Sequence, residues 1–492
     1  MRVLLVPELY RPEEASANAT LNDAVTWVEQ WLRIDDTLHV YWLLPHRGDA
    51  NYERPDVFAD RDRVTLVEAD PLMHDSSERY LFTESGYSAD QLRELRRRIY
   101  DELGYVDVVV DQYRNGRTDL YKWLLHLSGH RADQVNPFDI VVNVHDLMLP
   151  FKYPDDGHRF DYHRLLEAVE AVLADGMWFK AKLDRDELPM FARRVMPESL
   201  IEEALDRSVL TNSPIDFERF NERYSDEPRV FHVAGSGWEK KRQDVVMAVA
   251  ELLHEEYGIR TVITSMGGVP EEYAKLPWVR AHSEASRALY EETLATGDIT
   301  VCATEYDTLA RTWFEQAASG QVLVLRDEPW IYDCVPEDYP LVAPVDDLGA
   351  KARWVVDNWE TAVALNRRLV EHVRQVRSPE RAGRVTHDDM VWRVAEKVDR
   401  YERPRRPALR RAVEDAEESV ALDALDEAGA DYTADGDPLL DQEWCGLADL
   451  VFSLRLAGYA DTGNPGTPVF RRESTGRPAG DGEAARRRSQ RR

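Results

Sequence analysis

The sequence predicts an α/β protein with two Rossmann-like, doubly wound domains, followed by a small C-terminal appendage and a disordered tail. Its 492 residues are enough for two or three hydrophobic cores. The hydrophobic content of 43%, with 13 Trp and 21 Tyr, is typical of a chain that packs. Short β-branched runs alternate with helical patterns through about the first 400 residues, which is typical of βαβ units in a parallel sheet.

The first domain is predicted from the N-terminal set of apolar runs. We expect its strands at residues 3–6, 40–44, 64–67, 106–110, 140–144 and 209–211. Helical periodicity predicts helices between them, at 21–33 and 162–174.

The second domain is predicted from a similar set that follows a joint near Pro214. We expect its strands at 230–234, 261–265, 299–303, 322–325 and 341–343, and its helices at 244–256, 286–294, 308–319 and 348–359. The predicted organisation is a first domain over 1–208, a second over 209–402 whose last helix packs back on the first, an acidic linker over 403–437, a small helical or winged-helix-like appendage over 438–471 and a basic disordered tail over 472–492.

The charge balance is strongly acidic. The formal net charge is -30, from 92 acidic and 62 basic residues, and only nine of the basic residues are Lys. This pattern resembles that of halophilic proteins, because molar salt shortens the Debye length to ~3 Å and screens the repulsion within a negative surface. The alternative is an ordinary acidic protein from a GC-rich genome. In either case an acidic surface argues against nucleic acid as the main partner.

The cysteines and the N-terminus predict a cytoplasmic protein. Cys302, Cys334 and Cys445 are widely spaced, and they form neither a disulfide framework nor a zinc motif. The N-terminal apolar run is too short for a signal peptide, and no stretch approaches the ~20 apolar residues of a membrane span.

The most informative segment runs from Asp307 to Gly320, where a strand is followed by a helix and then by a glycine cap. Asp307 occupies the position of a helix N-cap, so the free N–H groups of Thr308, Leu309 and Ala310 are expected at the carboxyl end of the sheet, where a diphosphate binds well. Glu315 lies two helical turns after Thr308 and offers a carboxylate on the same face, which suits paired ribose hydroxyls. The alternative is a capping Asp and a solvated Glu on an ordinary helix.

This segment resembles the signature of the retaining, GT-B-fold glycosyltransferases of the group 1, or family 4, class. The signature is an acidic residue, seven intervening residues, and then Glu-Ala-x-Ala-x-Gly-x-Pro-Val. Here it reads Asp307, seven residues, and then Glu315-Gln316-Ala317-Ala318-Ser319-Gly320-Gln321-Val322.

Four further matches occur in the order of the family. Gly235 with Lys241 and Asp244 is similar to the strand end and Lys-Gly-x-Asp motif that open the second domain. The other three are Ser213-Pro214-Ile215-Asp216-Phe217-Glu218-Arg219-Phe220, which resembles the interdomain Asn-Gly-Val-Asp-x-x-x-Phe; Asn143-Val144-His145-Asp146, which resembles a Thr-Val/Ile-His-Asp/Asn strand end; and Trp392-Arg393-Val394-Ala395, which resembles a Trp-x-x-Val-Ala helix. The resemblance spans about residues 1–401.

The resemblance implies a hexosyltransferase-like enzyme with two domains that face a central cleft. The donor is a nucleotide-diphosphate sugar of the UDP or GDP type, bound by the second domain, and the sugar is transferred with retention to an acceptor on the first domain. Neither a cofactor nor a metal is expected in the site. Whether the acceptor is a glycan, a lipid-linked molecule or a protein is left open.

The resemblance also assigns roles to single residues. It implies that His145, Asp307 and Lys241 are catalytic, with Asp307 holding donor-sugar hydroxyls and His145 facing the donor sugar. The donor-binding set would be Gly235, Ser236, Lys241, Arg242, Thr308, Leu309, Ala310 and Glu315. The structural alternatives are a buried, hydrogen-bonded His145 and a solvated Lys241 whose role passes to Lys240 or Arg242.

Three departures from the family leave other functions open. Ser236 replaces an Arg that binds phosphate, Asp307 replaces a Glu, and the Gly-Gly acceptor loop is absent from residues 10–18. A degenerate protein that binds nucleotide or glycan without turnover is therefore one alternative, and a transferase recruited to nucleic acid by the appendage at 439–470 and its Arg-rich tail is another. Asp60-Arg61-Asp62 and Asp184-Arg185-Asp186 match a metal-binding Asp-x-Asp, but in so acidic a chain we interpret both as solvated surface.

Overall fold

The computed structural model describes residues 1–7, 19–45, 62–69, 106–112, 139–144, 172, 174–235, 241–265, 267–305, 307, 311–400, 419–421, 459–461 and 469–472. These residues form two parallel sheets and one small antiparallel sheet. Within them, no helix is both long enough and apolar enough to cross a membrane.

The first sheet has seven described strands in the order β3-β2-β1-β4-β5-β6-β7, all parallel. The order reverses at β1, as in a doubly wound fold. Its strands are β1 (Arg2–Val6), β2 (His39–Pro45), β3 (Val64–Ala69), β4 (Val108–Asp111), β5 (Asp139–Val144), β6 (Gly176–Phe179) and β7 (Ser208–Leu210). The described helices of this part are α1 (Ala19–Ile34), α5 (Lys182–Ala192) and α6 (Glu198–Asp206).

The second sheet has six described strands in the order β10-β9-β8-β11-β12-β13, and the order reverses at β8. Its strands are β8 (Val230–Ala234), β9 (Arg260–Thr264), β10 (Val279–His282), β11 (Ile299–Cys302), β12 (Val322–Arg326) and β13 (Val342–Ala343). Its helices are α7 (Gln243–Tyr257), α8 (Glu271–Ala274), α9 (Arg287–Leu294), α10 (Arg311–Ala318), α11 (Leu348–Asp357) and α12 (Trp359–Arg377), and short 3-10 turns lie at Phe217–Arg219, Pro329–Asp333 and Val345–Asp347.

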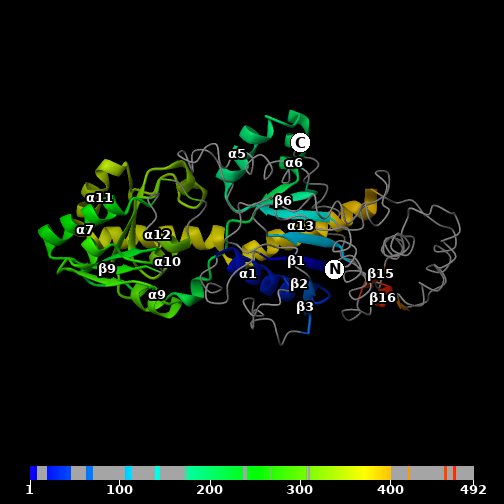
Figure 1. The fold of residues 1–492 in the computed structure, drawn as a ribbon, viewed down its shortest axis with the longest axis horizontal. Coiled ribbons are helices and arrows are strands. Elements are labelled where there is room, and N and C mark those ends of the chain that lie inside the picture. Colours follow the sequence, from blue (N-terminus) through cyan, green and yellow to red (C-terminus); the bar gives the residue numbers. More distant parts are fainter. Residues whose placement is uncertain are drawn as a thin grey trace.

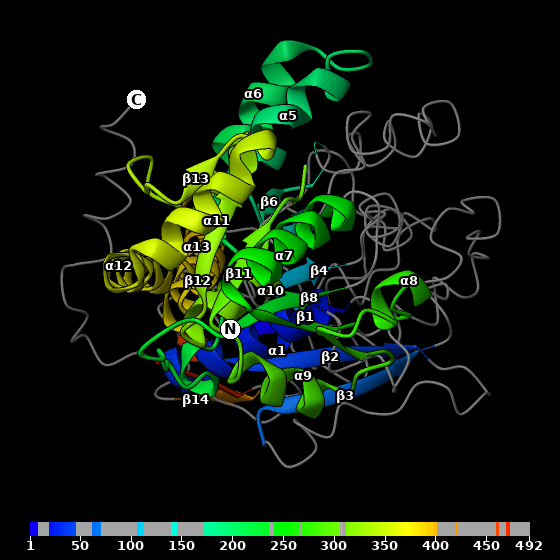
Figure 2. The ribbon, with the colours of Figure 1, turned by 90° about the vertical axis from the view of Figure 1, so that its left-hand side faces the viewer.

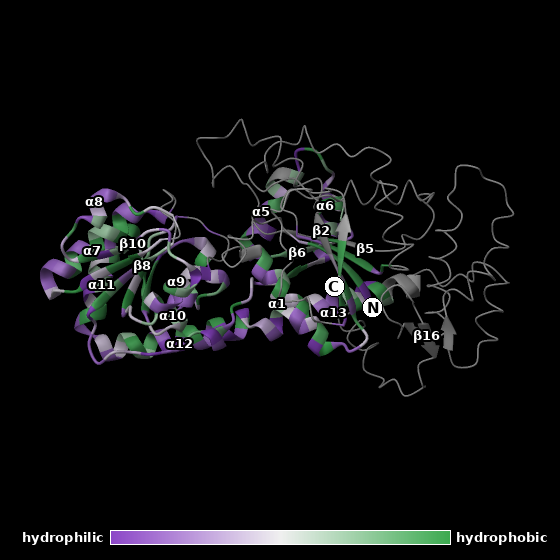
Figure 3. Ribbon diagram, turned by 60° about the horizontal axis from the view of Figure 1, so that its bottom comes forward, coloured by the Kyte–Doolittle hydropathy of each residue, from purple (hydrophilic) through white to green (hydrophobic). Residues whose placement is uncertain are grey.

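The helices cover both faces of the second sheet, as a doubly wound fold requires. Helices α7 and α11 lie on one face, and α9, α10 and α12 lie on the other (Figures 1 and 2). The strands between them are hydrophobic, whereas the helices also present hydrophilic positions (Figure 3). The four residues of β11 are all buried, so this strand lies at the centre of the core.

Helix α13 (Pro379–Arg400) returns the chain to the first sheet, where it packs against α1 (Figure 1). Trp31 Nε1 donates to Thr386 Oγ1 at 2.8 Å, and Trp178 Nε1 donates to Asp389 Oδ2 at 2.7 Å. The rings of Trp27, Trp31 and Trp178 pack on one another in a buried cluster. The three tryptophans bury a large apolar area, and the N–H groups of Trp31 and Trp178 find partners on α13.

Several elements differ from the sequence predictions. Strands β6 and β10 were not predicted, and the predicted helix at 348–359 ends at Asp357, before α12 begins at Trp359. The predicted helix at 162–174 lies almost wholly outside the described residues. In the C-terminal region, β14 (Ser419–Ala421), β15 (Tyr459–Asp461) and β16 (Val469–Arg472) form an antiparallel sheet in the order β14-β16-β15, so a strand occurs within the predicted linker.

Candidate functional site

The candidate site lies where β8 and β11 end side by side. These two strands are neighbours at the point where the strand order of the second sheet reverses. In open α/β sheets ligands bind beyond the carboxyl ends of the strands at such a switch point. Segment 235–244 follows β8, and segment 303–311 follows β11. These two segments contain every predicted donor-binding residue except Glu315.

Gly235 and Lys241 are in contact at the end of β8. Gly235 has a φ of +116°, which L side chains rarely adopt. A Cβ added to it would lie 2.8 Å from Lys241 Nζ. The ammonium group therefore lies directly against the backbone at the mouth of the sheet, where a ligand that touches Gly235 also meets a positive charge.

The charges of Asp307 and Lys241 both act on Cys302, the last residue of β11. Burial raises the pKa of the Cys302 thiol to about 12, while the charge of Asp307 acts in the same direction and the charge of Lys241 opposes it. Both charges are thus close to the end of one strand. The structure brings Gly235 and Lys241 close to Asp307, although Gly235 and Asp307 are more than seventy positions apart in the sequence.

A second group of charges borders this point. Arg242 donates to both carboxylate oxygens of Asp244, at 3.0 and 2.9 Å, and to Glu305 at 3.2 Å. The Arg242 hydrogen bonds lower the pKa of Asp244. Arg326, at the end of β12, pairs with Glu305 at 3.3 Å and with Glu328 at 2.7 Å. Glu305 therefore joins two guanidinium groups beside the candidate site.

Glu315 is held in a buried polar network on α10. Only 3% of the residue is exposed. Its carboxylate accepts from the Tyr290 hydroxyl at 2.9 Å and from two Arg287 nitrogens at 3.4 Å, and Arg311 Nε lies 3.8 Å away. Burial and the charge of Glu315 raise the pKa of Tyr290 well above its ordinary value. The alternative of a solvated Glu315 is therefore wrong.

Several other predicted residues lie outside the part of the chain that the structure describes. His145, Ser236, Thr308, Leu309 and Ala310 lie outside the described residues, so their predicted roles stay predictions. Of the two Asp-x-Asp segments, residues 60 and 61 also lie outside.

The prediction of a solvated surface is wrong for Asp184, in the second Asp-x-Asp segment. The sequence predicts that Asp184 and Asp186 are solvated, but Asp184 is fully buried in the first turn of α5, where the helix dipole favours a carboxylate. Asp186, by contrast, is half-exposed and pairs with Lys182 on the same helix.

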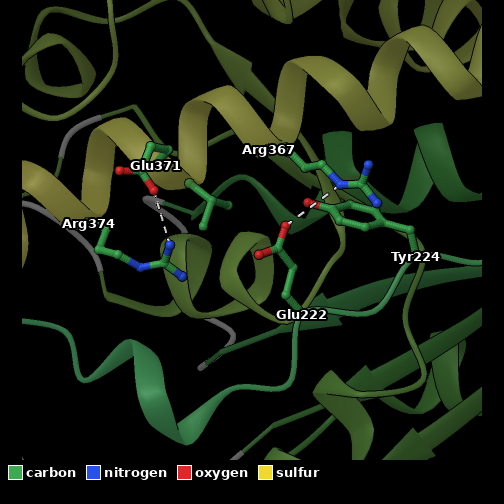
Figure 4. A pocket seen from close by; sticks show the side chains of 6 residues that line it. Glu222, Tyr224, Arg367, Glu371 and Arg374 are labelled. Carbon is green, nitrogen blue, oxygen red and sulfur yellow. Dashed lines mark hydrogen bonds and ion pairs between the residues drawn. The ribbon is translucent and has the colours of Figure 1, made fainter.

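A separate cavity of about 430 Å³ lies on α12, away from the strand ends (Figure 4). Its lining includes Arg367 and Arg374 from α12 and Tyr224 from the segment before β8. Each arginine already has a carboxylate nearby, with Arg374 3.1 Å from Glu371 and Arg367 4.0 Å from Glu222. Because these pairs are partly exposed, they contribute little to stability. None of the predicted donor-binding residues lines the cavity.

By sequence, no family model and no curated protein matches this chain. By structure, a sucrose-phosphate synthase from Thermosynechococcus elongatus matches with 15% identity and a TM-score of 0.57, over 80% of this chain and 99% of that one. A trehalose-6-phosphate structure from E. coli bound with UDP-2-fluoro glucose matches with 11% identity and a TM-score of 0.53, over 79% and 99%. Anabaena HepE in complex with UDP-glucose matches with 10% identity and a TM-score of 0.51, over 81% and 100%.

The chain has the GT-B fold. The fold predicted from the sequence is thereby confirmed. The GT-B match covers about four fifths of the chain, which is close to the extent of the motif resemblance.

Sequence reasoning missed several polar and charged residues of the second domain. Arg287 and Tyr290, which hold Glu315, come from α9, and Glu305 and Arg326 come from two different strand ends. The only sequence signal for them is their position just after or just before a predicted strand or helix. Such positions are too common in an acidic chain to single out a partner.

Proposed function

We propose that this chain is a glycosyltransferase that moves a sugar from a nucleotide-diphosphate donor of the UDP or GDP type to an acceptor bound by the first domain. One observation carries the proposal: Gly235, Lys241 and Asp307 meet at the switch point of the second sheet in a chain with the GT-B fold. Structural neighbours with UDP-2-fluoro glucose and UDP-glucose support a nucleotide-sugar donor. The buried free thiols of Cys302 and Cys334 suit the reducing cytoplasm in which we place the reaction.

In the proposed reaction, Lys241 stabilises the leaving diphosphate. Breaking the bond between the anomeric carbon and the diphosphate oxygen leaves negative charge on that oxygen, and a fixed cation lowers the energy of the transition state in which the charge develops. Lys241 already lies against the Gly235 backbone, so the chain does not have to reorganise when the charge appears. We assign the donor-sugar hydroxyls to Asp307 and, by the family resemblance, propose that the anomeric configuration is retained.

Glu315 is the proposed ligand of the ribose hydroxyls. Because its carboxylate is buried among Arg287, Tyr290 and Arg311, the ribose has to take the place of one of these partners. The two arginine contacts, at 3.4 Å and beyond, are longer than the Tyr290 hydrogen bond at 2.9 Å. We therefore expect Tyr290 to keep the carboxylate oriented while a guanidinium group gives way.

The experiment that tests the proposal measures consumption of a panel of UDP- and GDP-sugars by the wild type and by Lys241→Met. Loss of the cation should lower the rate by about 10²–10³-fold, the effect of removing one preorganised charge-stabilising group. The matched control is Lys351→Met, because Lys351 is an exposed lysine on α11 that bonds to the Pro340 carbonyl. Equal rates in the two variants would refute the role of Lys241, and NMR of the product anomer tests retention.

A second candidate function is nucleotide binding without turnover. Ser236 where the family has an arginine, and the existing partners of Glu315, both favour it. The same panel decides between the two candidates, since a protein of the second kind gains thermal stability with UDP or GDP and consumes no donor.

A further inference from the structure

The two crossings of the chain between the domains meet at one buried point. The first crossing follows β7, and the second is the joint between α12 and α13. Arg377, at the end of α12, donates from Nε to the Ser213 carbonyl at 2.8 Å, and the Ile215 N–H donates to the Arg377 carbonyl at 2.8 Å. Ser213 and Arg377 are fully buried, so the two interdomain segments are joined to each other at this point.

Asp23 of the first domain lies at this point. It belongs to α1 and is 2% exposed. Its carboxylate accepts from the Ser213 hydroxyl at 2.8 and 3.0 Å and from Arg311 Nη1 at 3.1 Å. Burial raises the pKa of Asp23, while the positive charges of Arg311 and Lys180 oppose the rise. Since Arg311 begins α10, this ion pair joins the first domain to the helix that carries Glu315.

Arg311 lies between two buried carboxylates, one from each domain. Its Nη1 is 3.1 Å from Asp23, and its Nε is 3.8 Å from Glu315, one helical turn further along α10. The side chain of Arg311 is 16% exposed, so both interactions are poorly screened by water. A change in the charge or the hydrogen bonding of Glu315 therefore acts directly on the contact between α10 and α1.

We propose that Arg311 is a positioning residue that couples donor occupancy at Glu315 to the contact with Asp23 across the domain boundary. The inference rests on the proposed function, because it takes the ribose to bind Glu315. When ribose hydroxyls donate to the Glu315 carboxylate, Arg311 gives up its 3.8 Å contact and keeps Asp23, which strengthens the interdomain pair and draws the domains together around the donor.

Linkage makes the coupling reciprocal. If donor binding strengthens the Asp23 contact, then loss of Asp23 weakens donor binding by the same factor, although the proposed function gives Asp23 no contact with the donor. Couplings of this kind are typically about 5–150-fold in affinity. A purely structural role for Asp23 would lower stability and leave the affinity for nucleotide unchanged.

The test uses the full chain and UDP and GDP as probes. Binding constants are measured by calorimetry, and the radius of gyration is measured by small-angle scattering with and without nucleotide. We expect Asp23→Asn to weaken binding at least about fivefold and to remove the decrease in radius that UDP or GDP causes in the wild type. The double variant Asp23→Asn/Arg311→Gln should lose no more affinity than Arg311→Gln alone, because both changes break one pathway.

The controls separate the possible failures. Arg353→Gln, which breaks an exposed pair within the second domain, should bind and contract as the wild type does. Should Asp23→Asn not fold, Ser213→Ala removes only the hydroxyl that donates to the Asp23 carboxylate. This variant should show the same losses of affinity and contraction, but smaller ones. Wild-type affinity and contraction in the folded Asp23 or Ser213 variant would overturn the coupling alone, whereas a wild type that binds neither nucleotide would overturn the proposed function as well.

Discussion

Replacement of Glu315 by Gln should destabilise the second domain strongly. The substitution keeps the shape of the side chain and an acceptor for the Tyr290 hydroxyl, but it removes a charge that faces Arg287 at 3.4 Å and Arg311 at 3.8 Å. Breaking a buried ion pair from one side typically costs 3–5 kcal/mol. Because both arginines retain some exposure, with 22% and 16% of their side chains accessible, we expect about 3 kcal/mol. For a domain of about 200 residues this lowers the melting temperature by about 6–12 °C.

Thermal unfolding followed by circular dichroism measures this effect. The matched control is Arg353→Gln, whose partner Glu256 lies 2.7 Å away and where both side chains are about two-fifths exposed. An exposed pair contributes at most about 1 kcal/mol, so the control should melt within ~4 °C of the wild type. If Glu315→Gln melts no lower than Arg353→Gln, the buried network around Glu315 does not carry the charge interaction that we derive.

Three further perturbations test other parts of the structure. Gly320→Ala should cost more stability in denaturant unfolding than Gly258→Ala. Both glycines have a positive φ (+93° and +71°), but a Cβ at Gly320 would lie 2.1 Å from the Arg223 carbonyl oxygen, whereas a Cβ at Gly258 would have nothing within 4 Å. Equal losses in the two variants would contradict the close approach of Arg223 to Gly320. Burial lowers the pKa of His232 from 6.5 to about 4, so neutral His232 contributes its full stability above pH 6.5, and about 3 kcal/mol of stability is lost as the pH falls from 6.5 to 4. His232→Gln should therefore flatten the dependence of the melting temperature on pH over that range. An unchanged slope would refute the lowered pKa. Raising KCl from low to molar concentration should raise the melting temperature because it screens the net charge of -30, and a fall would contradict the halophilic interpretation.

The strands could be predicted where apolar, β-branched residues form bounded runs. Residues 230–234 and 299–303 are such runs, and the structure has β8 and β11 there. The sequence does not predict strand β6, because Gly-Met-Trp-Phe begins with a glycine and has neither β-branched residues nor alternation. Its burial comes from its place between β5 and β7 and from the packing of Trp178 on α1 and α13, which only the tertiary structure supplies.

The candidate site could be predicted only as far as local motifs reach. The acidic residue followed by Glu315 and the glycine cap identified α10, but the partners of Glu315 come from α9 and could not be inferred from spacing. A similar limit applies to Gln316, which stands where the family signature has Ala, and to Gln321, which stands at a position that the signature leaves open. Both bond to the buried His232, 84 and 89 residues away, and form a polar cluster inside the domain that no local pattern indicates.

Calorimetric titration of UDP and GDP into the wild type, Lys241→Met and Lys351→Met tests the central claim most directly. We predict that at least one of the two nucleotides binds the wild type and Lys351→Met equally, and that its affinity falls at least tenfold in Lys241→Met, where the cation beside Gly235 is lost. Absence of binding to the wild type, or equal affinity in all three proteins, would contradict a diphosphate site at the ends of β8 and β11.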